Sequence, residues 1–96
     1  MSFSETDRDT IMGYLAWKSD SESISTIQAA LEQVETSSAA ETRVKAYLTA
    51  IAAIETQIAT ARNTVGSAYS QLLSEAQRLV YLIGNTLGVE VKRKVF

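Results

Sequence analysis

The stretch that decides the fold is VKAYLTAIAAIETQIATARNTV, residues 44–65. Apolar side chains recur through it at alternating intervals of three and four residues, which places them on one side of a helix. Alanine fills many of the other positions, and it has the highest helix propensity and lets a second helix approach closely. The repeat therefore predicts a long amphipathic helix with a coiled-coil-like packing face. Its positions are Val44, Tyr47, Ile51, Ile54, Ile58, Ala61 and Val65.

A second apolar stripe of the same kind follows, after a corner expected at Thr64–Ser67. Two long amphipathic segments joined by a short loop favour an antiparallel helical hairpin of about residues 41–64 and 68–87. One continuous helix is the alternative, because a single glycine costs a helix only about 1 kcal/mol relative to alanine. Gly88 stands where a left-handed residue commonly ends a helix. The second stripe comprises Tyr69, Leu72, Ala76, Leu79, Ile83 and Leu87, widened by Leu73, Val80 and Leu82.

Two shorter helices are expected before the hairpin. Ser4 and Asp7 form a capping-box pattern at the start of the first helix, which reaches about Trp17. Asp20 or Ser21 is the expected cap of the second helix, after a polar connection. The sequence thus predicts an all-α fold. The apolar faces comprise Ile11, Tyr14 and Leu15 in the first of these helices, and Ile24, Ile27, Leu31 and Val34 in the second.

Composition narrows the possible functions. The 96 residues form one small domain, and 46% hydrophobic with 21% charged residues is typical of a globular chain. There is no cysteine and no histidine, which removes thiol nucleophiles, disulfides, the commonest general base and the commonest metal ligand. No phosphate-binding GxxxxGK[ST] pattern occurs. We therefore expect no enzymatic activity, no cofactor and no metal.

The chain shows no sign of a membrane or export segment. No apolar run approaches the roughly 18 residues that span a bilayer. The N-terminal MSFSETDRDT is polar and acidic, unlike a signal peptide, so the cytoplasm is the default compartment. Residues 1–60 carry nine acidic and four basic side chains, whereas residues 61–96 carry two and five. Such asymmetry lets copies attract one another head to tail, unless it only reflects the basic C-terminal end.

The C-terminal GVEVKRKVF, residues 88–96, differs from everything before it. Its side chains alternate with a period of two, as in a strand, yet no second strand is evident in the chain. Residues 1–88 are therefore predicted to be a helical domain, and residues 89–96 an extended tail, disordered in the free protein, that adds to a partner by β-augmentation. A merely frayed end is the alternative. The docking positions are Val89, Val91, Lys92, Arg93, Lys94, Val95 and Phe96.

Three segments resemble one group of phage proteins. DRDTIMGYLAW at residues 7–17 is similar to the D-R-x-x-I-x-x-Y-L-G-x start of small proteins encoded among bacteriophage structural genes, notably of cyanobacterial phages. AAIETQIATAR at residues 52–62 resembles their aIEtqLtdAR segment, and residues 75–96 resemble EgrRLVgrLanlLgVpVrrDvF. LGVEVKRKVF is the most specific part. Ala16 stands in place of a glycine of that pattern and Lys94 in place of an acid, which puts charge pairing at position 94 in doubt.

The resemblance implies a head-tail connector or adaptor of a tailed-phage neck. Such a protein forms a ring, of about twelve copies in a portal adaptor, and docks onto the portal through a C-terminal extension. The expected partners are the portal and a further neck or tail protein, with packaged DNA as a possible contact and no membrane. The expected location is the virion neck, after assembly in the host cytoplasm.

Two other functions remain open from the sequence. One is a cytoplasmic oligomerisation module whose heptads pair copies, and the other is a small DNA-binding regulator using VKRKV. The residues expected to serve helix packing or oligomer contacts are Val44, Tyr47, Ile51, Ile54, Ile58, Leu72, Leu79 and Ile83.

Overall fold

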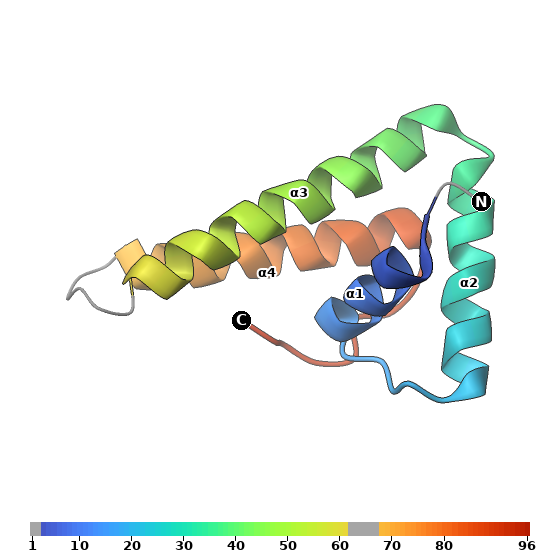
Figure 1. Cartoon of the computed structure of the whole chain (residues 1–96), viewed down its shortest axis with the longest axis horizontal. Coiled ribbons are helices and arrows are strands. Elements are labelled where there is room, and N and C mark those ends of the chain that lie inside the picture. Colours follow the sequence, from blue (N-terminus) through green and yellow to red (C-terminus); the bar gives the residue numbers. More distant parts are fainter. Residues whose placement is uncertain (1–2, 62–67) are drawn as a thin grey trace.

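The computed structural model describes residues 3–61 and 68–96, and within these ranges the chain forms four helices and no strand (Figure 1). The all-α prediction is confirmed for the described residues. The expected corner at residues 64–67, and the question of a continuous helix there, lie outside them. The helices are α1 (Glu5–Leu15), α2 (Ser21–Glu35), α3 (Ser38–Ala61) and α4 (Ala68–Leu87).

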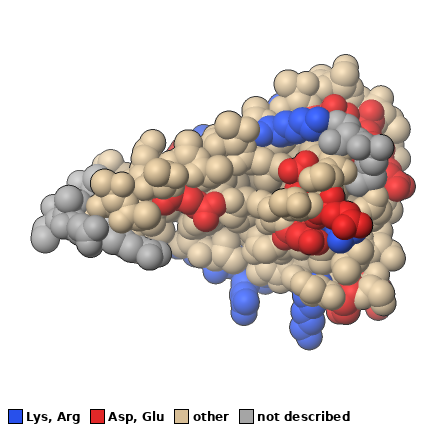
Figure 2. All heavy atoms as spheres, in the orientation of Figure 1, with Lys and Arg blue, Asp and Glu red and all other residues tan. Residues whose placement is uncertain are grey.

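The two longest helices, α3 and α4, pack along one another and run in opposite directions in Figure 1. Helix α2 stands across one end of this pair, and α1 lies beside it against α4. The other end of the pair extends beyond α1 and α2 as a narrow projection (Figures 1 and 2). The chain therefore has a broad end, where all four helices meet, and a slender end built from α3 and α4 alone. None of the described helices combines the length and hydropathy that a membrane span requires.

The core lies at the broad end and draws on every helix. The predicted stripes point into it, since Val44, Ile51 and Ile83 have no exposed surface. Phe3 was not anticipated, yet it is only 2% exposed. Its N–H donates to Glu35 Oε1 at 3.1 Å, which fixes the start of the chain onto α2. The largest fully buried side chains are Phe3, Ile11, Leu15, Ile27, Leu31, Val44, Ile51, Val80 and Ile83.

The predicted helix caps are largely confirmed. Ser4 and Asp7 form a capping box, in which each side chain accepts the other residue's N–H at 3.1 Å. Asp20, rather than Ser21, caps α2, because its Oδ1 accepts the Ser23 N–H at 2.7 Å. That backbone hydrogen bond lowers the pKa of Asp20. Gly88 has φ +72°, the left-handed conformation expected after α4.

The first helix ends two residues earlier than predicted, because Ala16 adopts the left-handed conformation at φ 61°. Its N–H donates to Gly13 O at 3.3 Å, and the next N–H, of Trp17, donates to Met12 O at 2.9 Å. These bonds satisfy carbonyls at the end of α1 and turn the chain sharply. Ala16 is also the position at which the resembled phage pattern has glycine.

Replacing Ala16 with glycine should stabilise the protein. A left-handed conformation costs an L-residue about 1–2 kcal/mol that glycine does not pay, so we expect the free energy of unfolding to rise by about 1 kcal/mol. The matched control is Ala46→Gly at an exposed, helical position of α3, which should lower it by a similar amount. Urea denaturation followed by circular dichroism measures both. If the two substitutions changed stability in the same direction, the left-handed turn would not exist in solution.

The predicted disorder of residues 89–96 is wrong for this structure. The segment forms no strand, but it packs back along the broad end of the molecule, and Lys92 N–H donates to Leu15 O at 2.9 Å. The prediction considered only another strand as a partner. The actual partners are a helix-end carbonyl and side chains of α1, α4 and the connection after α1.

Candidate functional site

The candidate site is the C-terminal segment, residues 89–96, together with the surface of α1 and α4 that holds it. Three hydrogen bonds fix its first half. Val89 N–H donates to Gly84 O at 3.0 Å, Lys92 N–H to Leu15 O at 2.9 Å, and the indole N–H of Trp17 to Glu90 O at 2.7 Å. The segment thus bridges the C-terminal ends of α1 and α4.

A buried glutamine holds the second half of the segment. Gln77 of α4 is only 5% exposed, and its Oε1 accepts the N–H groups of Val95 at 3.2 Å and Phe96 at 3.1 Å. Its Nε2 is buried without a hydrogen-bond partner among the described residues. An unpaired buried donor lowers stability by about 1–3 kcal/mol, so the Gln77 amide binds the segment through its oxygen while its NH₂ group reduces the net gain.

Gly84 lets the segment lie directly against α4. A Cβ at this buried position would lie 3.0 Å from Val91 Cγ2 and 3.2 Å from Val89 O, both of the C-terminal segment. The third neighbour, Leu15 Cδ2, is at an ordinary 3.6 Å. A glycine inside a helix costs about 0.5–1 kcal/mol relative to alanine. What the missing side chain provides here is room for residues 89 and 91.

The side chains of the segment alternate at first and then change register. Val89 and Val91 are half-buried against the core, while Glu90 and Lys92 are exposed, as a period of two predicts. A bend at residue 93 interrupts the alternation. As a result, Val95 is 40% exposed rather than packed against the helices. Phe96 instead is half-buried, with its ring centroid 6.1 Å from that of Tyr14.

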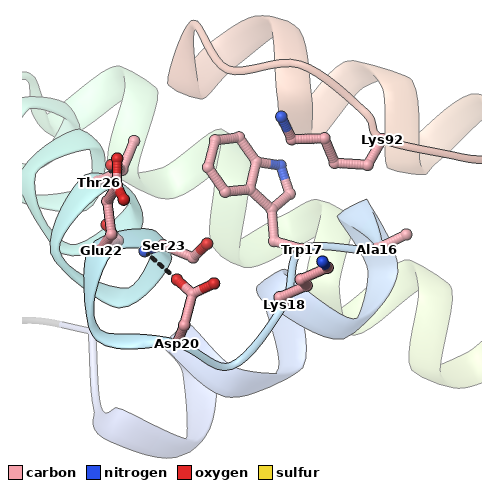
Figure 3. Close-up of a pocket in the computed structure, with 8 residues that line it drawn as sticks. All are labelled: Ala16, Trp17, Lys18, Asp20, Glu22, Ser23, Thr26 and Lys92. Atoms are coloured by element: carbon pink, nitrogen blue, oxygen red, sulfur yellow. Dashed lines mark hydrogen bonds between the residues drawn. The ribbon is translucent and has the colours of Figure 1, made fainter.

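A surface cavity of about 430 Å³ adjoins the first half of the segment (Figure 3). Lys92 extends over the ring of Trp17, with Nζ 4.4 Å from the ring centroid, a cation–π arrangement. Lys92 Nζ also lies 3.5 Å from Glu90 Oε1. Lys18 and the acidic residues Asp20 and Glu22 complete a lining of mixed charge. This lining favours no ion of one sign, and we assign no ligand to the cavity.

Tyr14 and Glu55 pair beside the end of the chain. The Tyr14 hydroxyl donates to a carboxylate oxygen of Glu55, which joins α1 to α3. Burial, followed by the hydrogen bond and the charge of Glu55, raises the pKa of Tyr14. The hydroxyl therefore stays protonated as a donor at neutral pH, which is a positioning role. In the described part of the chain, no cluster of acidic side chains is arranged to hold a metal ion.

The remaining basic side chains of the segment face solvent. Arg93 and Lys94 are exposed, and neither forms an ion pair with a described residue. In Figure 2, basic side chains project from the edge along which the C-terminal segment runs in Figure 1, whereas acidic ones gather over α1. A basic strip is therefore available to a partner while the rest of the segment is held against the helices.

The eight helix-packing candidates all lie inside the single chain. Five are buried, Val44, Ile51, Ile58, Leu79 and Ile83, and three are half-buried, Tyr47, Ile54 and Leu72. The five buried side chains are therefore used within the chain, whereas the three half-buried ones keep some surface for contacts between copies. The outward side of α3 carries many alanines and threonines, together with the exposed charged residues Arg43, Lys45 and Glu55. The exposed Thr42, Thr49 and Thr56 donate their hydroxyls to carbonyls of their own helix.

Sequence reasoning missed Trp17, Gln77 and Gly84 as partners of the C-terminal segment. The sequence of α4 did contain one indication of these partners. Residues that recur there at intervals of four and three include a glutamine and a glycine among aliphatic residues. A polar side chain and a missing side chain on one buried face indicate a neighbour with exposed backbone. The stripe comprises Leu73, Gln77, Val80, Gly84 and Leu87.

Comparison with known proteins identifies no relative. No protein-family model, no curated protein and no solved structure matches the chain.

Proposed function

We propose that the chain is a structural virion protein, a neck connector that forms a ring between the portal and the tail of a bacteriophage. The observation that carries the proposal is the C-terminal segment. Its residues bear the most specific part of the resemblance, and the segment lies on the surface without regular secondary structure. Its basic side chains, Arg93 and Lys94, are exposed. An extended basic segment of this kind suits docking onto an acidic surface of a neighbouring protein.

The helical body suits a ring subunit. In the proposal, the antiparallel pair of α3 and α4 is the rigid unit that packs beside copies of itself, and its slender end reaches toward the next component. Support comes from the elongated shape, 43 × 28 × 20 Å. Closed rings of identical subunits need two different faces that meet, which an elongated and asymmetric unit provides.

The two alternatives have less support. A coiled-coil oligomerisation module would need its heptad residues free, yet Val44, Ile51 and Ile83 have no exposed surface. A DNA-binding regulator would need a broad basic surface, but the chain has net charge −2. Outside the C-terminal segment, the exposed bases of the described residues are spread over the connection after α1, α3 and α4, and they comprise Lys18, Arg43, Lys45 and Arg78.

The proposal predicts that the portal protein of the same phage captures the chain in a salt-dependent manner. Replacing Arg93 and Lys94 with glutamine should slow association by about ten-fold at low salt, because exposed charges mainly steer encounter. The control is Arg43→Gln, which removes an exposed base near the start of α3. Surface plasmon resonance at two salt concentrations measures the rates.

Mass spectrometry of purified particles and light scattering complete this test. We expect the chain in the virion and a ring-sized species on mixing with the portal. A chain that remained monomeric both alone and with the portal, and that was absent from particles, would exclude a connector.

A further inference from the structure

We propose that the C-terminal segment is a latch: bound to α1 and α4 it holds the chain in a closed state that cannot dock, and it swings out at Gly88 without unfolding the helices. This inference rests on the proposed function, because docking through the segment gives the closed state its consequence. The surface beneath the segment is called the latch groove below, and consists of Leu15, Trp17, Gln77 and Gly84.

The closed state is built into the helices. Both short contacts of a Cβ at Gly84, at 3.0 and 3.2 Å, are with Val91 and Val89 of the segment itself. The position therefore needs glycine only when the segment is in place. Gln77 is equally specific, since one buried oxygen accepts two consecutive N–H groups near the end of the chain. Two separate sites along α4 thus match the path of the segment.

The same contacts leave the segment free to open as a unit. Gly88 has φ +72° and no side chain, so it can adopt the wide range of backbone conformations that opening at this position requires. Every hydrogen bond that holds the segment uses a main-chain atom, which water can satisfy after release. Gln77 Nε2 lacks a described partner in the closed state, and opening lets water reach it. Segments with few buried contacts open at a lower free energy than the core does.

Closure and docking compete for the same groups. Docking as an added strand would use the segment's main-chain N–H groups, and those of Lys92, Val95 and Phe96 are already bonded within the chain. The apolar anchors Val91 and Phe96 are half-buried against the core. The partner must therefore take the segment from the latch groove. The exposed side chains of the segment, Arg93 and Lys94 among them, are available for first contact while the latch is closed.

Hydrogen exchange of the full chain tests the latch without any partner. We expect the N–H groups of Lys92, Val95 and Phe96 to exchange about 10- to 100-fold more slowly than in an unstructured chain. Those of Val80 and Ile83 in the core of α4 should exchange at least about 100-fold more slowly again. Unprotected tail amides would show that no latch exists. Tail amides that exchanged only together with α4 would show that it cannot open separately.

A matched pair of glycine substitutions tests the role of Gly84. In Gly84→Ala the new methyl meets the segment, and tail exchange should accelerate about ten-fold or more while α4 stays protected. In Gly13→Ala, at an exposed position where a Cβ meets nothing within 4 Å, tail exchange should not change. Equal tail exchange in the two variants would overturn the proposed fit.

A disulfide lock tests the competition with docking. The 3.0 Å between a Cβ at position 84 and Val91 Cγ2 is about the distance from a Cβ to the far sulfur of a disulfide, so Gly84→Cys with Val91→Cys should cross-link readily. The chain has no other cysteine. We expect the oxidised double variant to lose binding to the portal of the same phage at least about ten-fold, and the reduced form, its own control, to bind.

The outcomes separate the two proposals. If the oxidised form bound as well as the reduced form, the latch would be wrong and the connector function would stand. If neither form nor the unmodified chain bound the portal, the connector function would fail. Hydrogen exchange would then still decide whether the segment closes and opens as described.

Discussion

Replacing Ile51 with aspartate should leave the protein unfolded. Ile51 lies near the middle of α3, has no exposed surface, and belongs to the core cluster in which all four helices meet. A carboxylate there would be removed from water with no basic partner, which costs more than a small domain's stability of about 5–15 kcal/mol readily tolerates. Far-UV circular dichroism should show loss of helix, without a cooperative thermal transition. Leu79→Asp on α4 should have the same result for the same reason.

The neighbouring residue provides the control for Ile51. Ala52→Asp places the same charge on an exposed position of the same helix, and we expect a change of less than about 1 kcal/mol. Ile51→Ala gives a measurable intermediate, with an expected loss of about 2–5 kcal/mol from the cavity left behind. A folded Ile51→Asp protein with near-normal stability would contradict the arrangement of α3 in the core.

Deleting residues 89–96 should abolish docking and also weaken the fold. The helices should remain, because α4 ends at Leu87 before the deletion begins. Stability should fall by about 1–3 kcal/mol, since Val89, Val91 and Phe96 pack on the core and would no longer cover it. The sequence prediction of a disordered segment would instead imply unchanged stability, because a segment with no partner in the chain covers no core. Urea denaturation and a portal pull-down measure the two effects.

Two substitutions separate the role of the segment in docking from its role in covering the core. Arg93→Ala should leave stability unchanged because the side chain is exposed. Phe96→Ala should lower stability slightly and weaken docking, because it removes a half-buried ring in contact with Tyr14. Normal docking of the truncated chain would assign docking to another part of the molecule.

The helices could be predicted from the sequence because each leaves a periodic trace. Val44, Ile51 and Ile58 recur at intervals of seven and are all buried, and Ser4 carries a capping pattern that the structure reproduces. Local rules of this kind need no knowledge of the remaining chain. The end of α1 was different, because Ala16 occupies a conformation that its own identity disfavours.

The latch groove could not be predicted because its contacts are between atoms that every residue possesses. Leu15 uses its main-chain carbonyl, and Gly84 matters because it has no side chain. Neither feature can be recognised from the periodicity of the sequence. Trp17 and Gln77 are exceptions, because each holds the segment through its side chain. Gln77 is also a polar residue on a face that is otherwise aliphatic. The candidate residues of the segment itself were found because their alternation differs from the helices, but their partners came only from the structure.

Because these contacts use main-chain atoms of the segment, different residues of the segment serve closure and partner binding. Val91 and Phe96 face inward, and the hydrogen bonds ignore side-chain identity, so nothing in the closed state depends on which residues stand at 93 and 94. Acidic or neutral residues could replace the two basic ones at these positions. The segment would then still adopt the closed state but would bind a partner surface of different charge. Different atoms therefore hold the segment closed and select its partner. Main-chain atoms and the inward side chains hold the segment on the helices, whereas the exposed side chains at positions 93 and 94 determine which surface it binds.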